Sequence, residues 1–421
     1  MEVEIISVGN ELILGQIVNT NVAYLADQLR QLDLVAKWQT TVTDEPAQIE
    51  AAVKLACQRA DLVLVCGGLG PTADDQTLPS VARALGVDLT LATKHWAAIQ
   101  ADFAHRQVAM TPENIRQAYY LAGGEPLANP VGLALGSWLV SEQAAVAVLP
   151  GPPREFKAMV QASLLPKLRA HYGTTTPVQT RVLHFVGQPE SLLMDEIAAA
   201  LGDLPVVATS YVQPAEIQVR LRVTGKTPAV AEQLLDQAQQ AIVAKEGAYY
   251  FGSGPAVTLA GQVVALLRQR GAKITAAESL TGGLFQSTLC SVSGASAVFD
   301  GGFVTYAARA KHQLIGVRQA TIEQAGVVSA QTAAEMAEGA RRALAVDYGV
   351  AFTGVAGPEP LEGHPAGTVF VAIAQQGAAP RAWQLRLNGR LGRQAIRQQS
   401  VALVLLALYH QLQGKNQNAG S

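Results

Sequence analysis

The stretch "ITAAESLTGG" (residues 274–283) decides the fold of the part of the chain around it. It opens on apolar residues typical of a strand and ends on a glycine pair, after which a helical pattern resumes. A strand that leads through glycines into a helix is the repeating unit of a parallel sheet covered by helices. We therefore expect a strand at 272–277 in an α/β domain, with Ser279 at its carboxyl end.

The same alternation of apolar runs and amphipathic helical stretches continues in both directions from this stretch. Since 421 residues exceed what one core usually supports, more than one domain is expected. The predicted fold class is α/β, with two three-layer α/β/α domains of mainly parallel sheets joined by a small α+β middle domain. The predicted segments are a first domain at 1–172, a middle domain at 178–252, a last domain at 255–413 and a disordered tail at 414–421.

Local patterns predict the elements of these domains. Residues 215–225 alternate between apolar and polar, as expected of a half-exposed antiparallel strand. The stretch "TDEP" (43–46) and Ser329 each indicate the start of a helix. Further strands are predicted at 3–9, 61–68 and 144–153, and helices at about 19–32, 189–201 and 258–270.

Composition narrows the classes of function. The formal net charge of −2, without a basic stripe, argues against direct nucleic-acid binding. The apolar run 401–409 is far shorter than the roughly 20 residues of a membrane span, so no membrane contact is expected. The three cysteines match no zinc or redox spacing, and the first residues lack the pattern of a secretory signal. We expect a cytoplasmic protein.

Two interpretations of Ser279 remain open at this point. Serine and threonine beside a glycine pair after a strand are common turn and capping residues. Alternatively Ser279 is a nucleophile, which requires a nearby base. No histidine is close in sequence, and Lys311 is the candidate base, because burial can lower the pKa of a lysine. A second glycine turn, "TGVAGP" (353–358), is expected at the same carboxyl edge, where ligands bind in open α/β sheets.

The stretch "CGGLGPTADDQT" (66–77) poses a similar choice in the first domain. Its glycines allow backbone N–H groups to approach phosphates. Asp74 and Asp75 would repel phosphates unless a divalent cation lies between them. The alternative is that Asp74 caps a helix and Asp75 favours its dipole.

The C-terminal segment 255–412 resembles the competence/damage-inducible protein CinA family, whose C-terminal domain is similar to nicotinamide mononucleotide (NMN) deamidases. The matching stretches are "AESLTGG" (277–283), "FVTY" with Lys311 five residues after Tyr306, "AEMAEGARRA" (334–343), "TGVAGP" (353–358) and "GTVFVAIA" (367–374). This resemblance implies a Ser–Lys amidase without a cofactor.

In that implied amidase, Ser279 attacks the carboxamide and Lys311 is the general base. Thr281 and Tyr306 polarise or position this pair. The residues implied to hold the substrate are Glu278, Gly282, Gly283, Ser296, Gly354, Gly357, Arg390, Arg393 and Arg397.

Residues 1–170 resemble the molybdopterin-binding (MoaB/MogA-like) domain at the front of CinA proteins. The matching stretches are "GNELILGQIVNTN" (9–21), "GGLGPTADDQT" (67–77), "NPVGLALG" (129–136) and "LPGPPREF" (149–156), and the middle segment matches through "VGQPES" (186–191) and "AEIQVRLR" (215–222). The resemblance implies a metal-dependent ADP-ribose pyrophosphatase using Mg or Co. Asp74, Asp75 and Glu11 would place the metal. Asn21, Gly67, Gly68, Gly70 and Thr72 would shape the diphosphate pocket.

The first hypothesis is thus a bifunctional hydrolase acting on NMN and ADP-ribose, expected to be a homodimer. Relatives often carry a polar pair with an asparagine just after the tyrosine, where this chain has Ala307 and Ala308. A second hypothesis follows, in which only the first domain is active and the amidase fold is a scaffold. A third is a non-catalytic adaptor of the DNA-uptake machinery.

Overall fold

The computed structural model describes residues 1–30, 32–173 and 178–414. The chain divides into two compact units, Met1–Val178 and Gln179–Ser421. From residue 415 on, the predicted disordered tail lies outside the described residues. No helix in the described part of the chain is long and apolar enough to cross a membrane.

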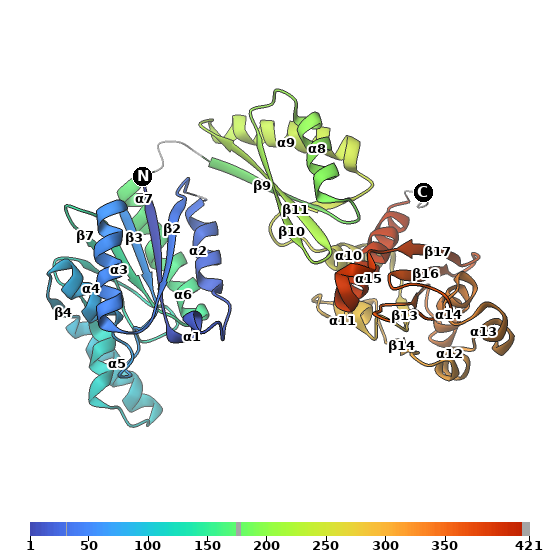
Figure 1. Ribbon diagram of the computed structural model, residues 1–421, viewed down its shortest axis with the longest axis horizontal. Helices are drawn as coiled ribbons and strands as arrows, with labels where there is room; N and C mark the ends of the chain where they lie inside the picture. The colour runs from blue at the N-terminus through green and yellow to red at the C-terminus, as the bar shows by residue number, and fades with distance from the viewer. Residues whose placement is uncertain (31, 174–177, 415–421) are drawn as a thin grey trace. The chain divides into compact units, whose positions relative to one another are not determined.

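The first unit is built on a six-stranded sheet with the order β2-β1-β3-β8-β7-β6 (Figure 1). Its strands are β1 (Val3–Val8), β2 (Ala36–Val42), β3 (Leu62–Cys66), β6 (Glu125–Leu127), β7 (Gly136–Val140) and β8 (Ala145–Leu149). The pairs β1–β2, β1–β3 and β3–β8 are parallel, whereas β7 and β6 add antiparallel strands at one side. The carboxyl ends of four parallel strands therefore share one edge.

Helices cover both faces of this sheet. One core cluster packs α2 and α6 against β1 and β3, and a second packs α3 and α4 against the other face. The helices are α1 (Asn10–Ile13), α2 (Thr20–Arg30), α3 (Pro46–Arg59), α4 (Thr77–Leu85), α5 (Thr93–Arg106), α6 (Pro153–Met159) and α7 (Leu165–Tyr172), and a small pair is formed by β4 (Leu89–Leu91) and β5 (Tyr119–Leu121). Every residue of β3 and β8 is buried, which explains their uninterrupted apolar sequences.

The second unit begins with a four-stranded sheet of order β10-β11-β9-β12. Its elements are β9 (Val178–Phe185), α8 (Glu190–Leu201), β10 (Val207–Gln213), β11 (Glu216–Thr224), α9 (Pro228–Glu246) and β12 (Tyr250–Ser253). Burial alternates along β11, and β10 pairs with it antiparallel, so the prediction from 215–225 is confirmed. Val186 and Phe251 lie in the same core cluster as α15, which joins this small sheet firmly to the last domain.

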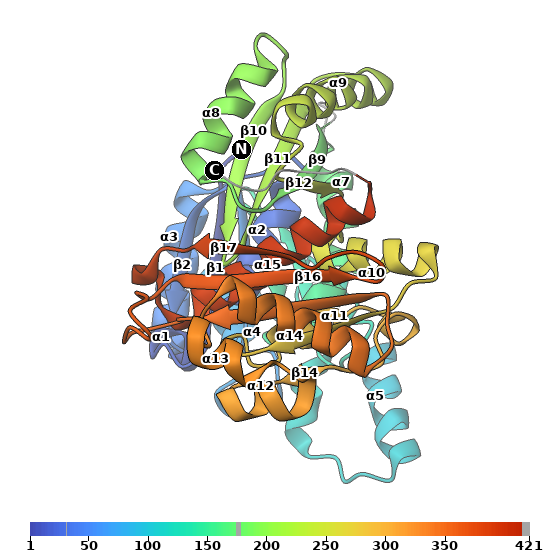
Figure 2. The same ribbon diagram turned by 90° about the vertical axis from the view of Figure 1, so that its right-hand side faces the viewer.

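The last domain holds a five-stranded sheet of order β14-β13-β15-β16-β17. Its strands are β13 (Ile274–Glu278), β14 (Phe303–Val304), β15 (Tyr348–Gly354), β16 (Thr368–Gln375) and β17 (Arg381–Arg386). The strand β13 pairs in parallel with β14 and β15. The strands β16 and β17, which are labelled in Figure 2, follow as antiparallel strands. The α/β prediction is confirmed, with antiparallel strands added at one side of each large sheet.

Two helix layers enclose the last sheet. On one face α10 and α15 supply most of the core, and on the other α14 packs against β15 and β16. The helices are α10 (Leu259–Arg270), α11 (Leu284–Cys290), α12 (Ala308–Ile315), α13 (Gln319–Ala325), α14 (Ala330–Ala343) and α15 (Gly392–Leu412). The Ser329 hydroxyl accepts the Thr332 N–H at 3.1 Å, which confirms the predicted cap of α14.

Candidate active sites

Ser279 follows the last residue of β13, at the carboxyl edge of the last sheet. Its N–H donates to the Phe352 carbonyl at 2.9 Å, so the turn after β13 is held against the end of β15. Gly282 and Gly283 have φ values of +58° and +92°, which favour glycine, and they let the chain reverse into α11. The two glycine turns thus meet, as the parallel arrangement of β13 and β15 predicts.

Glu278 has a different place from the one predicted. Its carboxylate is fully buried and accepts the N–H groups of Gly283 (2.9 Å), Phe285 (3.1 Å) and Gln286 (2.9 Å). These are N–H groups at the start of α11, where a helix N-terminus can otherwise bind an anion. Since a carboxylate of the chain already occupies them, the assignment of Glu278 to substrate binding is wrong. Glu278 instead fixes the turn that carries Ser279.

Lys311 reaches Ser279 from α12. Its Nζ lies 3.0 Å from the Ser279 Oγ, 2.8 Å from the Thr305 carbonyl oxygen and 3.2 Å from the Tyr306 carbonyl oxygen. The side chain is only 1% exposed. Burial lowers the pKa of Lys311 from 10.5 to about 8, and the negative charge of Glu362 acts weakly in the opposite direction.

These contacts orient the amine as a base. A neutral amine has two N–H groups and one lone pair, and a carbonyl oxygen can only accept a hydrogen bond. When both N–H groups of Lys311 point at the carbonyls of Thr305 and Tyr306, the lone pair is left for the Ser279 hydroxyl. The geometry matches a nucleophile within hydrogen-bond reach of its base.

A pocket of about 370 Å³ opens beside Ser279. Most of its lining is apolar, and its polar side chains are those of Ser279, Tyr306, Thr353, Glu359 and Arg393. Its wall residues are Leu280, Val327, Val328, Gly354, Val355, Ala356, Gly357, Pro358, Glu359, Pro360 and Leu361. Gly354 and Gly357 therefore line the pocket, while Gly282 and Gly283 support the turn behind Ser279.

Tyr306 and Arg393 lie together at the rim. The Arg393 guanidinium donates to the Tyr306 hydroxyl at 2.9 Å and to the Gly357 carbonyl at 3.2 Å. Tyr306 is 62% exposed, and its backbone carbonyl, not its ring, contacts Lys311. Ala307 and Ala308, which follow it, are exposed at the start of α12.

Arg397 and Thr281 form a supporting contact. The Arg397 guanidinium donates twice to the Thr281 carbonyl, at 2.6 and 3.2 Å. The Thr281 hydroxyl is buried and has no hydrogen-bond partner within the described ranges, so it makes no hydrogen bond to Ser279 or Lys311. Both residues hold the glycine turn in place.

Ser296 and Arg390 lie away from the pocket. The Val298 carbonyl accepts the N–H of Ile274, the first residue of β13, which places Ser296 near the amino end of that strand. At about 3.3 Å per residue, the strand separates it from Ser279 by roughly 16 Å. The assignment of Ser296 to the substrate site is wrong, because the chain must return to the amino end before β14 can run parallel to β13. Arg390 is exposed and is not part of the lining.

The glycine loop of the first unit is tightly folded after β3. Gly67 has a φ of +117°, and a Cβ there would lie 2.2 Å from the Val8 carbonyl oxygen. Asp75 accepts from the Thr72 N–H (2.8 Å) and hydroxyl (2.5 Å), which closes the loop on itself. A pocket of about 290 Å³ beside this loop is lined by Gly68, Leu69, Gly70, Asp75, Gln76, Leu78, Pro79, Leu89, Arg116, Tyr119 and Leu135. Thr72, Asp74, Glu11, Asn21 and Gly67 lie outside its lining.

Asp44, Glu11, Asp74 and Asp75 all follow strands that end at the carboxyl edge of the first sheet. Burial and the negative charges of Glu11, Asp74 and Asp75 raise the pKa of Asp44, while the Asn10 N–H, 2.9 Å from its carboxylate, acts against them. Sequence reasoning interpreted Asp44 only as part of a helix start and missed its place here. The signal was its position just after β2, at the same edge as the glycine loop.

These carboxylates offer oxygen ligands of the kind that a divalent cation takes. In the described part of the chain, no three His, Cys, Asp or Glu side chains form a ready-made metal cluster. Mg²⁺ is usually held by one or two carboxylates together with substrate phosphates, and it binds oxygen ligands. The negative charges of Glu11, Asp74 and Asp75, which act on Asp44, fit that arrangement. The Asn21 side-chain amide donates a hydrogen bond to the Gly151 carbonyl at 2.7 Å. This contact holds α2 to the segment after β8.

Comparison with known proteins shows the family to which the chain belongs. Residues 4–170 match a probable molybdopterin binding domain, residues 180–252 the damage-inducible protein CinA KH domain, and residues 256–412 the CinA C-terminal domain. A putative competence-damage inducible protein of Limosilactobacillus reuteri (strain DSM 20016) is 57% identical over 413 residues, which are 98% of this chain and 100% of that protein. The chain belongs to the CinA family.

Other CinA relatives extend this likeness. A putative competence-damage inducible protein of Lactiplantibacillus plantarum is 43% identical and covers 98% of both chains. The crystal structure of the protein CinA with unknown function from Thermoplasma acidophilum is 34% identical and covers 38% of this chain and 94% of that chain, with a TM-score of 0.36. The names of these relatives state no activity.

Proposed function

We propose that the last domain of this CinA protein is an amidase that converts NMN to nicotinic acid mononucleotide and ammonia. The observation that carries the proposal is the buried Lys311 amine, 3.0 Å from the Ser279 hydroxyl and fixed by two backbone carbonyls. A surface lysine that merely packs beside a turn would keep its charge in water. Here burial lowers the pKa of Lys311 to about 8, so a neutral amine is accessible near physiological pH.

The chemical steps follow from this arrangement. Lys311 takes the hydroxyl proton while the Ser279 Oγ bonds to the carboxamide carbon, which gives a tetrahedral intermediate. The protonated amine then returns its proton to the departing nitrogen. The C–N bond breaks, ammonia leaves, and an ester between Ser279 and the acyl group remains. Water, deprotonated by the again neutral Lys311, cleaves the resulting ester and frees Ser279. One amide and one water thus give one carboxylic acid and one ammonia.

The pocket suits an aromatic carboxamide attached to a phosphorylated ribose. Apolar residues such as Val327, Val355 and Leu361 provide surfaces for a flat ring. Arg393 lies on the rim and offers a planar guanidinium to a phosphate. Its existing contacts with Tyr306 and Gly357 keep it across the entrance.

The test is release of ammonia from NMN by the full chain. We expect activity in the unmodified protein and a loss of at least about 100-fold in Ser279→Ala and in Lys311→Met, because general-base catalysis contributes roughly 10² to 10⁴. Lys273→Met is the matched control, since Lys273 is half exposed and pairs with Asp300 at the surface. Absence of ammonia from the unmodified protein would refute the proposal.

We also propose a second activity, metal-dependent hydrolysis of ADP-ribose to AMP and ribose 5-phosphate in the first unit. The observation that favours it is the group of carboxylates around Asp44 beside a glycine loop and a pocket. Asp75 and Glu11 would share the cation with the diphosphate, and Mg or Co would there neutralise charge on the phosphate oxygens. The pocket offers Tyr119 and Leu89 as surfaces for a base.

AMP release with and without a chelator tests this second activity. We expect AMP only with the metal present, and a loss in Asp75→Asn, which also weakens the contact with Thr72. Asp102→Asn is the control, because Asp102 is a surface residue of α5 paired with Arg106. AMP release that is unaffected by the chelator would remove the carboxylates from this role.

A further inference from the structure

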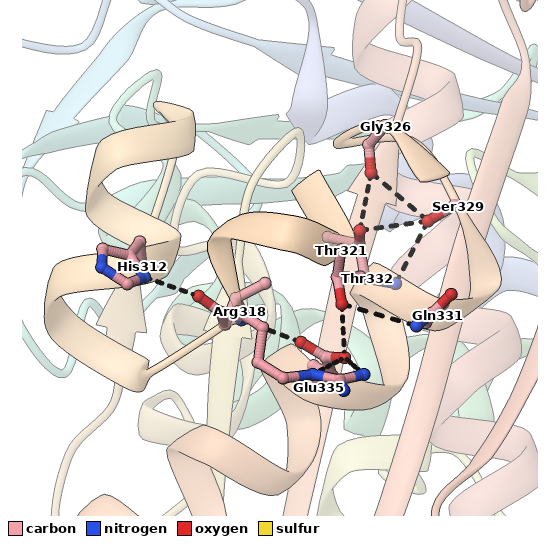
Figure 3. Close-up of polar contacts among 9 residues, drawn as sticks. His312, Arg318, Thr321, Gly326, Ser329, Gln331, Thr332 and Glu335 are labelled. Carbon is pink, nitrogen blue, oxygen red and sulfur yellow. Dashed lines mark hydrogen bonds and ion pairs between the residues drawn. The ribbon is translucent and has the colours of Figure 1, made fainter. Parts of the chain in front are cut away.

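One wall of the pocket beside Ser279 is a short irregular segment, residues 326–329, which we call the wall segment. Val327 and Val328 from this segment line the pocket. On the side facing α14, the Gly326 carbonyl accepts the Thr332 hydroxyl at 2.6 Å and the Ser329 hydroxyl at 3.3 Å, as Figure 3 shows. The cap of α14 therefore anchors one side of the wall segment.

Glu362 anchors the other side. Its Oε1 accepts the Val327 N–H at 3.0 Å and its Oε2 accepts the Val328 N–H at 2.9 Å. Glu362 belongs to the β15–β16 loop, whose residues up to Leu361 form the opposite wall of the pocket. One carboxylate thus ties the two walls together.

Backbone geometry shows that this contact is tightly constrained. Glu362 has a φ of +51°, a left-handed conformation that non-glycine residues rarely adopt. A Cβ on Gly326 would meet the Glu362 Oε2, so a larger residue there would displace the carboxylate from its present position. Thr353, at the end of β15, adds a second link through its hydroxyl, which donates to the Val327 carbonyl at 2.5 Å.

We propose that Glu362 is a positioning residue of the amidase: it sets the distance between the wall segment and the β15–β16 loop, and thereby the fit of the substrate ring. This inference rests on the proposed amidase function. The residue acts through Val327 and Val328 and takes no part in the bond changes. Its charge is also the one whose field opposes the effect of burial on Lys311.

Steady-state kinetics of Glu362→Ala with NMN provide the first test. We expect KM to rise about tenfold, because two charge-assisted hydrogen bonds that hold the wall are lost. We expect kcat at pH 9 to fall less than threefold, because Lys311 is largely neutral there with or without the Glu362 charge and its contact with Ser279 does not depend on the wall segment. Glu362→Gln, which keeps one acceptor oxygen, should recover part of the affinity.

Two further variants separate positioning from general damage to the fold. Glu323→Ala removes an equally charged, exposed residue of α13 whose carboxylate accepts a hydrogen bond from Gln319 at 2.9 Å, and should leave KM unchanged. Thr353→Val removes the second link to Val327, and its effect should be non-additive with that of Glu362→Ala because both act on one segment. If Glu362→Ala instead lowered kcat about tenfold and left KM unchanged, the proposal would be overturned.

Amide hydrogen exchange keeps the test independent of turnover. Exchange at Val327 and Val328 should be faster in Glu362→Ala than in the unmodified chain or in Glu323→Ala. If the unmodified protein releases no ammonia, the amidase proposal fails, and unchanged exchange would separately refute the anchoring by Glu362. Faster exchange in an inactive chain would support the anchor and refute only its link to NMN.

Discussion

The buried amine of Lys311 leads to a quantitative prediction about pH. Its pKa is lowered from 10.5 to about 8, mainly by burial. Because the base must be neutral, kcat/KM for ammonia release should rise with pH and level off above pH 8. With a pKa of about 8, roughly one lysine in ten is neutral at pH 7 and nine in ten at pH 9, so we expect an increase of about tenfold.

The same lowering of the pKa has a consequence for stability. Lowering a pKa by one unit corresponds to about 1.36 kcal/mol, so holding the charged amine in this site costs about 3 kcal/mol. The unfolded lysine keeps its proton up to about pH 10.5, whereas the folded one loses it near pH 8. Between these values the unfolded state binds more protons, so the free energy of unfolding rises with pH; below pH 8 the full cost remains.

The perturbation that isolates this term is Lys311→Met, compared with the unmodified protein by urea unfolding from pH 7 to pH 10.5. The difference in unfolding free energy between the two should change by up to about 3 kcal/mol in favour of the unmodified protein across this range. Lys273→Met, at an exposed lysine, should show no such trend. A flat difference, together with a rate that still rises above pH 10, would refute the reasoning that burial prepares Lys311 as a base.

Three other predictions follow from the contacts described. Glu278→Ala should lower the free energy of unfolding by about 3 kcal/mol, because three N–H groups of the α11 turn lose a buried carboxylate, and Glu278→Gln should lose less; equal stability in urea unfolding would contradict this cap. Asp44→Asn should change the Mg²⁺ concentration for half-maximal AMP release about tenfold, since Asp44 is coupled to Glu11, Asp74 and Asp75, and an unchanged titration would exclude it from the cation site. Lys311→Met should abolish ammonia release and leave AMP release unaltered, because the two candidate sites lie on separate sheets; parallel loss of both would show that they are not independent.

The candidate amidase site was predictable in part from sequence. The parallel βα pattern around "ITAAESLTGG" places Ser279 and the "TGVAGP" turn at one edge, and the structure has both there. Lys311 could be named as a candidate base, although it lies 32 residues from Ser279 along the chain. Its burial depends on the packing of α12, which no local pattern encodes.

Sequence patterns did not predict the role of a residue where that role depends on the path of the chain in three dimensions. Ser296 lies between the two members of the Ser–Lys pair in sequence, yet the return of the chain puts it near the opposite end of β13. Glu278 is adjacent to Ser279, but alternation along a strand turns its side chain to a different side, where it caps α11. Asp44 and Glu362 were missed because each contacts residues far away in the chain.

The sequence by itself determined the α/β class, the strands and helices, and the glycine turns that carry the candidate groups, because hydrophobic periodicity and backbone freedom are local properties. Only the tertiary structure decided that Lys311 is buried against two carbonyls, that Glu278 supports the turn, and that Glu362 joins the pocket walls. These features depend on distances between segments that are remote along the chain, and burial, pKa and hydrogen bonding follow from those distances.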